Sequence, residues 1–125
     1  MYSVRIRDHI MIAHSLPHPG FGPAQNMHGA TYVVDAEFFT SQLNEMKVAI
    51  DIGEAHQILK EVLQPLGYQN LDALPQFKNE LTTTEFIAKY IFDQIQERIS
   101  NSFSGKLKVT LGESHVAWAS YEGNV

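Results

Sequence analysis

The spacing of apolar residues changes along the chain from a period of two to a period of 3.6 and back, which constrains the fold more than any other feature. Residues 2–12 alternate between apolar and polar side chains, a pattern that predicts a half-buried strand. Residues 31–40 are rich in β-branched and aromatic side chains and predict a second strand. Alternation returns over residues 106–114 and 115–123, which predict the last two strands.

Two helices are predicted between these strand pairs. Apolar residues at i, i+3 and i+4 predict a first helix from about Gly53 to Gln64, with Asp51 as its cap. The "TTTE" of residues 82–85 matches a capping box and predicts the start of a second helix. The buried stripe expected on this helix is Ile87, Ala88, Ile91, Phe92, Ile95 and Ile99. The order β-β-α-α-β-β predicts one α+β domain over residues 1–125, a four-stranded antiparallel sheet with both helices on one face.

Composition excludes several classes of protein. Among 125 residues, the formal net charge is -5 and Lys and Arg are scattered, which argues against nucleic acid as a partner. No apolar run is long enough to cross a bilayer, and the alternating start does not match a signal peptide, so we expect no membrane partner. Cysteine is absent, which fits a reducing compartment such as the cytoplasm and excludes thiolate chemistry.

Six short motifs, in order from about residue 6 to residue 121, resemble those of one family. "IAHSLP" resembles "AAHRLP", "MHGATY" resembles "LHGHNY", and "VAIDIGEAHQILKEVL" resembles "MVVDFGDLKRALKEVL". "LGYQNLDALPQF" is similar to "LDHRNLNDLPEF", "LTTTEFIAKYIF" to "NPTSENLARYIF", and "LGESHVAWASY" to "VWETPTNWAEY". The family comprises the 6-pyruvoyl-tetrahydropterin synthases and the bacterial 6-carboxy-tetrahydropterin synthases of queuosine synthesis, which are lyases.

The resemblance implies the tunnelling fold, in which sheets of three subunits join into a barrel and two such rings stack into a hexamer. It also implies a pocket at a subunit interface for a pterin- or purine-like ring, with Glu113 as the anchor of the ring. Thr83 and Glu85 lie where the family places pocket-wall residues. The residues alone leave other roles open: Glu113 as a polar turn residue, and Thr83 and Glu85 as helix caps. Trp118 is expected in the core or at an interface.

The resemblance also implies a zinc site, but this chain departs from it. The family uses three His, and His14 and His28 match the first two, whereas the third position is Ala30. A catalytic zinc usually has three protein ligands and a water. His18 or a residue of a neighbouring subunit are the remaining candidates for a third ligand. The other His residues are expected to be surface or scaffold residues, namely His9, His56 and His115.

The catalytic positions of the family are changed as well, so we assign no catalytic residue. Ala24 replaces the Cys base, and Gly67 and Tyr68 replace an Asp-His pair. We therefore expect a protein of pterin or queuosine biosynthesis that binds a pterin- or purine-like ring through Glu113, with the zinc-dependent lyase chemistry lost or altered. The alternatives are an active zinc-dependent synthase with an unidentified third ligand, and a structural oligomer with a vestigial pocket.

Overall fold

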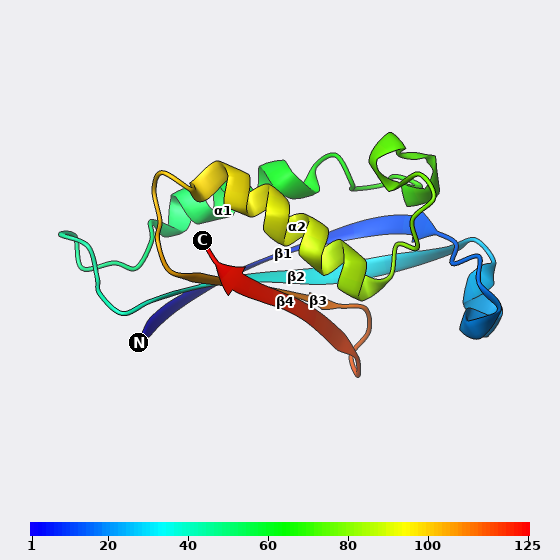
Figure 1. Cartoon of the computed structure of the whole chain (residues 1–125), viewed down its shortest axis with the longest axis horizontal. Helices are drawn as coiled ribbons and strands as arrows, with labels where there is room; N and C mark the ends of the chain where they lie inside the picture. The colour runs from blue at the N-terminus through cyan, green and yellow to red at the C-terminus, as the bar shows by residue number, and fades with distance from the viewer.

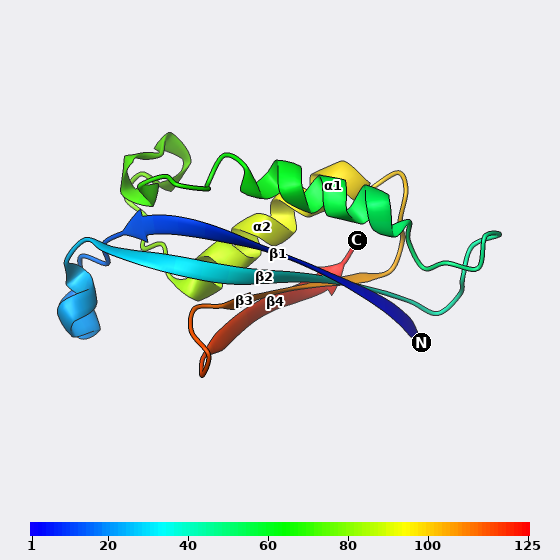
Figure 2. The ribbon, with the colours of Figure 1, turned by 180° about the vertical axis from the view of Figure 1, so that it is seen from behind.

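The computed structural model describes residues 1–125 as one sheet with helices over one of its faces (Figure 1). The four strands form an antiparallel sheet in the order β1-β2-β3-β4. The strands are β1 (Tyr2–His14), β2 (His28–Thr40), β3 (Lys106–Gly112) and β4 (Trp118–Asn124). The helices α1 (Ile52–Leu63) and α2 (Thr84–Ile99) lie on the same side of the sheet in both views (Figures 1 and 2). The predicted order and α+β class are confirmed.

The strands differ in length, and this difference creates the open end where the candidate site lies. β1 and β2 have 13 residues each and pair over their whole length, from Tyr2 opposite Thr40 to His14 opposite His28. β3 has 7 residues and pairs with β2 only from Val33 onward. The first residues of β2 therefore extend past the end of β3. In Figure 2 the two long strands run together to the short helical segment η1 (Pro19–Gln25).

The core lies between the helices and the near face of the sheet. The even-numbered positions of β1 and β2 point toward the helices because side chains alternate along a strand. The stripe predicted on α2 is buried in full, and it packs against Leu107, Val109 and Leu111 of β3 in one continuous cluster. Burial of these side chains removes apolar surface from water, which stabilises the fold.

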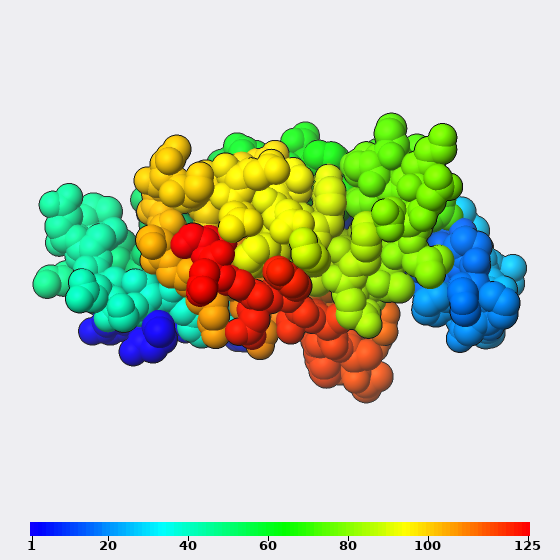
Figure 3. All heavy atoms as spheres, in the orientation of Figure 1, coloured from blue at the N-terminus to red at the C-terminus, as the bar shows by residue number.

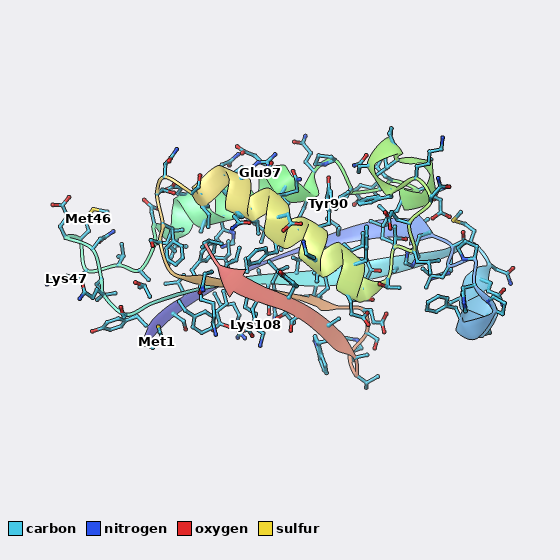
Figure 4. The ribbon with its side chains drawn as sticks, in the orientation of Figure 1. Met1, Met46, Lys47, Tyr90, Glu97 and Lys108 are labelled. Atoms are coloured by element: carbon cyan, nitrogen blue, oxygen red, sulfur yellow. The ribbon has the colours of Figure 1, made fainter.

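The opposite face of the sheet is polar and uncovered. Arg7 donates two hydrogen bonds to the carboxylate of Asp35 on the neighbouring strand, at 2.7 and 3.0 Å. Lys108 projects from the same face, below the sheet in Figure 4, whereas Tyr90 and Glu97 extend from α2 on the other side. The alternation seen in the sequence therefore separates a helix-covered face from a charged one.

The starts of the two helices agree with the sequence to different degrees. Asp51 caps α1 as predicted, because its carboxylate accepts a hydrogen bond of 3.2 Å from the Glu54 N–H. The second helix begins where the "TTTE" pattern predicted, but its cap is not Thr82, the first residue of the pattern; the cap role left open for Thr83 is confirmed. Thr83 is the cap of α2, and its hydroxyl accepts from the Phe86 N–H at 3.2 Å. The Thr82 hydroxyl is buried and hydrogen-bonded to a histidine of β1, so it is not available to cap.

The remaining connections hold shorter elements. The long loop predicted after α1 contains two short turns, η2 (Leu71–Ala73) and η3 (Pro75–Phe77). The last strand begins at Trp118 instead of residue 115, because the Glu113 N–H donates to the Ala117 carbonyl and closes a turn. The tip of this β3–β4 hairpin protrudes from the body of the molecule (Figure 3). No helix has both the length and the apolar character needed to span a bilayer.

Candidate functional site

A cavity of about 590 Å³ lies beside the open end of β2. One wall is β2 itself, and the opposite wall is the end of β3 with the turn that follows. The lining residues are His14, His28, Gly29, Ala30, Thr31, Tyr32, Val33, Gly112, Glu113, Ser114 and His115. The fold thus brings together His14, His28 and Glu113, which the resemblance had singled out from three distant parts of the sequence. His115, expected to be a surface or scaffold residue, is exposed at the rim of this cavity.

His14 and His28 form a contacting pair at one end of the cavity. They are directly opposite in the register of β1 and β2, and their ring centroids are 4.6 Å apart. His28 Nδ1 donates a hydrogen bond of 2.8 Å to the Asn26 carbonyl, so the neutral ring keeps Nε2 as an acceptor. His14 Nδ1 is hydrogen-bonded to Thr82 Oγ1 at 2.9 Å. Both rings are therefore held through Nδ1, the arrangement that orients histidine ligands in metal sites.

The environment of His14 favours its neutral form. The side chain is 3% exposed, and burial lowers its pKa below the usual value of 6.5. A positive charge on His28 would lower the pKa of His14 further, while the carboxylates of Asp72 and Glu113 act in the opposite direction. His14 is consequently an uncharged imidazole at neutral pH.

The residues beside this pair do not fit a zinc site with three protein ligands. Ala30 lies on the same face of β2 as His28, two residues further along, and its methyl group offers no donor. His18 is engaged elsewhere, because its Nδ1 accepts from the Gly20 N–H at 2.9 Å and its ring packs against Phe21. No three side chains of His, Cys, Asp or Glu are arranged to hold a metal ion. Within one chain, the donor set stops at two imidazoles.

Glu113 is held at the other end of the cavity by the start of α2. The Thr84 hydroxyl donates a hydrogen bond of 2.9 Å to Glu113 Oε2, and Thr84 itself is only 8% exposed. The N-terminus of a helix also favours a nearby negative charge. Since one hydroxyl uses only one lone pair, the carboxylate retains acceptor capacity on both oxygens. The result is an oriented, ionisable acceptor on a residue that lines the cavity.

The three neighbouring threonine and glutamate positions have different roles. Thr83 caps α2 and lines neither cavity, whereas Glu85 lines a smaller hollow of about 360 Å³ on the other side of Glu113. Thr84 was not singled out from the sequence, and its only signal was its place between two predicted wall residues. Tyr32, which also lines the cavity, was not singled out from the sequence either. The pKa of its phenol is raised, mainly by burial and also by the charge of Glu113, although a hydrogen bond with Thr84 acts in the opposite direction.

The positions of the missing catalytic groups of the family are occupied by structural residues. Ala24 lies in η1, and its carbonyl accepts a hydrogen bond of 3.0 Å from the Leu16 N–H. Tyr68 is 86% exposed and has a left-handed backbone with φ of 59°. Its N–H donates to the Met11 carbonyl at the outer edge of β1, across the strand pair from the cavity.

Trp118 is not a core residue of the single chain. Its side chain is 63% exposed and lies against Gly112, its partner in the β3–β4 pairing. A Cβ at Gly112 would come within 2.9 Å of the indole ring, so glycine is needed for this approach. Its predicted place at an interface stays a prediction.

The sheet order, the two helices on one face and the cavity at the end of β2 define the tunnelling-fold class. The family model described as 6-pyruvoyl tetrahydropterin synthase matches residues 3–124. The chain belongs to the 6-pyruvoyl tetrahydropterin synthase family.

Individual relatives agree with this assignment. A 6-pyruvoyl tetrahydrobiopterin synthase of Dictyostelium discoideum is 32% identical over 77 residues, which cover 60% of this chain and 57% of that protein. The matched segment thus spans little more than half the length of that relative. The structure of Caenorhabditis elegans 6-pyruvoyl tetrahydropterin synthase aligns with a TM-score of 0.86 and 24% identity, covering 98% of this chain and 95% of the other. The Plasmodium vivax synthase aligns with a TM-score of 0.80 and 17% identity over 100% of both chains.

Proposed function

We propose that this protein binds a pterin- or purine-like ring through Glu113, and that the zinc-dependent lyase chemistry of the family is lost or altered. The observation that carries the proposal is Glu113, which lines a cavity of about 590 Å³ and whose carboxylate is held by the Thr84 hydroxyl. Cavities of this volume are within the range of small-molecule sites. The family resemblance supports the same role for Glu113.

The chemistry of Glu113 selects the edge of the ring that it would bind. An ionised carboxylate only accepts hydrogen bonds, and two parallel N–H groups satisfy both of its oxygens. A pterin or a guanine presents such a pair, one N–H of the ring and one of the exocyclic amino group. A ring that carries a carbonyl oxygen in place of the amino group would place an acceptor against the carboxylate and would be rejected.

The proposed change in chemistry rests on the donor groups. The reaction of the family needs a metal to polarise an oxygen and a base to move each proton. Here the metal ligands stop at His14 and His28. The loop of residues 15–27 has no Cys, Asp or Glu to serve as a base, and its one histidine, His18, accepts a hydrogen bond from the Gly20 N–H through Nδ1. Each missing base costs about 10²–10⁴-fold in rate. We infer a ligand-binding protein or a diverged enzyme of pterin or queuosine biosynthesis, acting in the cytoplasm.

We also propose that the cavity is completed in a homo-oligomer, a trimer or a hexamer. β4 is a free edge of the sheet, and the edge of β1 is covered by the loop after α1 only at Met11 and Ala13. Free edges pair with other chains unless they are protected. Val116 and Trp118, at the protruding hairpin, are 85% and 63% exposed. Light scattering on the purified protein would test this: a monomer would overturn the proposal.

The first experiment is a binding titration of neopterin, whose ring carries the 2-amino group, against lumazine, whose ring carries a carbonyl there. The wild-type chain should bind neopterin and not lumazine. Glu113→Gln should weaken neopterin binding by about 100-fold, because hydrogen bonds to a charged group contribute about 1.5–3 kcal/mol each. Equal affinity of the wild-type chain and Glu113→Gln would overturn the proposal.

An active zinc-dependent synthase is the second candidate. The observation that favours it is the engagement of Nδ1 in both His14 and His28, which leaves Nε2 of each ring for another ligand. It requires a third ligand from outside the chain. Metal analysis of protein purified without a His-tag distinguishes the two candidates, since only the second predicts zinc near one equivalent per chain.

A further inference from the structure

The two histidines at one end of the cavity have different kinds of hydrogen-bond partner. His28 Nδ1 contacts the main-chain carbonyl of Asn26 at 2.8 Å, whereas His14 Nδ1 contacts the side-chain hydroxyl of Thr82 at 2.9 Å. A carbonyl oxygen can only accept a hydrogen bond, but a hydroxyl can either accept or donate. The partner of each ring therefore decides which of its two nitrogens carries the proton.

The carbonyl partner fixes the proton of neutral His28. Because the Asn26 carbonyl accepts, His28 Nδ1 carries the hydrogen. The other nitrogen of a neutral imidazole is then an unprotonated acceptor. His28 therefore presents a lone pair at Nε2, which is the form that a metal ligand needs.

The proton of neutral His14 is fixed by the burial of Thr82. Thr82 is 1% exposed, and the one hydrogen-bond partner of its hydroxyl is His14 Nδ1. If Nδ1 donated to this oxygen, the hydroxyl hydrogen would be buried without an acceptor, which is unfavourable. The hydroxyl therefore donates to Nδ1, and the proton of the ring is on Nε2. The main-chain carbonyl of Thr82 also lies near the ring and favours its charged form, but only the hydroxyl is in hydrogen-bonding position.

Nε2 of His14 reaches the cavity even though the side chain is only 3% exposed. No buried nitrogen or oxygen atom of a side chain lacks a hydrogen-bond partner, and the ring of His14 is bonded through Nδ1 alone. Nε2 is therefore not a buried atom, and both rings line the cavity. Because the ring centroids are 4.6 Å apart, a group in the cavity beside one ring is also beside the other.

We propose that Thr82 is a positioning residue that holds His14 in the tautomer with its proton on Nε2, so that the two histidines present one donor and one acceptor to the cavity. A hydroxyl group or a water molecule is the complement of such a pair, because one oxygen can accept from His14 Nε2–H and donate to His28 Nε2. A metal ion is not, because it needs a lone pair on both nitrogens. The inference deepens the proposed loss of zinc chemistry and does not depend on ring binding by Glu113.

The Thr82 hydroxyl is a feature of this chain and not of the family motif. "LTTTEFIAKYIF" is similar to "NPTSENLARYIF", which has Pro at the position of Thr82 and so has no hydroxyl there. Histidine ligands of metals usually donate their second N–H to a carboxylate, a carbonyl or a water, whereas His14 accepts from Thr82. Zinc at His14 would break this bond, at a cost of about 3- to 10-fold in affinity. A third histidine would outweigh that cost, but two histidines alone are weakened by it.

NMR of metal-free protein with isotope-labelled histidine tests the inference, because the chemical shift of a ring nitrogen distinguishes a protonated from an unprotonated atom. At about pH 7.5, above the ordinary pKa of histidine, His14 should carry its proton on Nε2 and His28 should carry its proton on Nδ1. A proton on His14 Nδ1 would overturn the inference alone. Zinc near one equivalent per chain in the purified protein would overturn the proposed loss of zinc chemistry and this inference with it.

Two variants at Thr82 separate the hydroxyl from the shape of the side chain. Thr82→Val removes the hydroxyl and keeps the shape, so His14 should no longer be held in one tautomer and its two ring-nitrogen shifts should move toward each other. Thr82→Ser keeps the hydroxyl and should retain the wild-type shifts. In a chain given a third histidine by Ala30→His, Thr82→Val should bind zinc about 3- to 10-fold more tightly than Thr82→Ser. Equal shifts and equal zinc affinities in the two variants would overturn the inference.

Discussion

The two ends of the cavity are built to different degrees of completeness. At one end, the carboxylate of Glu113 is oriented by Thr84 and retains acceptors for a ligand. At the other, His14 and His28 are both held through Nδ1, yet the next position on their face is Ala30. The glutamate end therefore has an oriented acceptor, whereas the histidine end has the orienting contacts of a metal site without a third ligand.

This difference shows that a metal site has two separate requirements, the orientation of its ligand side chains and the number of its donor atoms. The histidine pair depends on the register of β1 and β2 and on contacts with Thr82 and Asn26. These contacts hold the rings through atoms of the protein alone. The number of donors depends on single side chains, and one substitution removes a donor without disturbing the pair. The same separation makes the comparison testable by mutation.

The largest effect is expected from Ala30→His. The new imidazole would leave the same face of β2 as His28 and complete three ligands. Zinc retained after dialysis should rise from well below one equivalent to about one per chain, a gain of at least 100-fold in affinity. Metal analysis of untagged protein measures this. His28→Ala in the same background is the control and should abolish the gain. A wild-type chain that already holds one zinc would contradict the comparison.

A smaller effect is expected from Thr84→Val, which removes the hydroxyl that orients Glu113 while keeping the shape of the side chain. Neopterin affinity should fall by about 10-fold, the value of one hydrogen bond to a charged group. Thr83→Val is the matched control on the same helix. It removes the cap of α2 and should cost about 1 kcal/mol of stability with little change in affinity. Equal losses of neopterin affinity in the two variants would contradict the role of the Thr84 hydroxyl in orienting Glu113.

The histidine end should also contribute to the pH dependence of stability. The pKa of His14 is lower in the folded chain than its unfolded value of 6.5, so the unfolded chain binds more protons as the pH falls below about 6.5. This contribution is fully present above pH 6.5 and is lost as the pH falls through the folded pKa of His14. Urea unfolding at about pH 7.5 and about pH 5.5 measures the loss of stability. His14→Gln should lose less stability over this range than the wild-type chain.

The smallest effect is expected at Tyr68, which lies outside both ends of the cavity. Its left-handed backbone is unfavourable for a side chain with a Cβ, and glycine adopts it without this cost. Tyr68→Gly should therefore raise the free energy of unfolding by about 0.5–1 kcal/mol, the net of relieved strain and lost chain entropy. Neopterin binding by one chain should not change. Tyr68→Phe keeps the strain and should leave stability at the wild-type value.

The sequence by itself determined the elements and their order. Periodicity is a local property, so the strands, the helices and the buried stripe of α2 could be predicted from neighbouring residues. The resemblance to the family identified Ala30 as the departure from its three histidines, and strand alternation places Ala30 on the same face as His28.

Only the tertiary structure decided how these parts meet. The bond between Thr84 and Glu113 joins residues 29 positions apart, and no local pattern predicts it. The cap of α2 is Thr83 because the fold places the Thr82 hydroxyl against His14, which overrides the capping-box pattern. The open end of β2 exists because β3 ends at Gly112, far along the chain. Each of these features depends on contacts between distant segments, which form only when the sheet and the helices pack together.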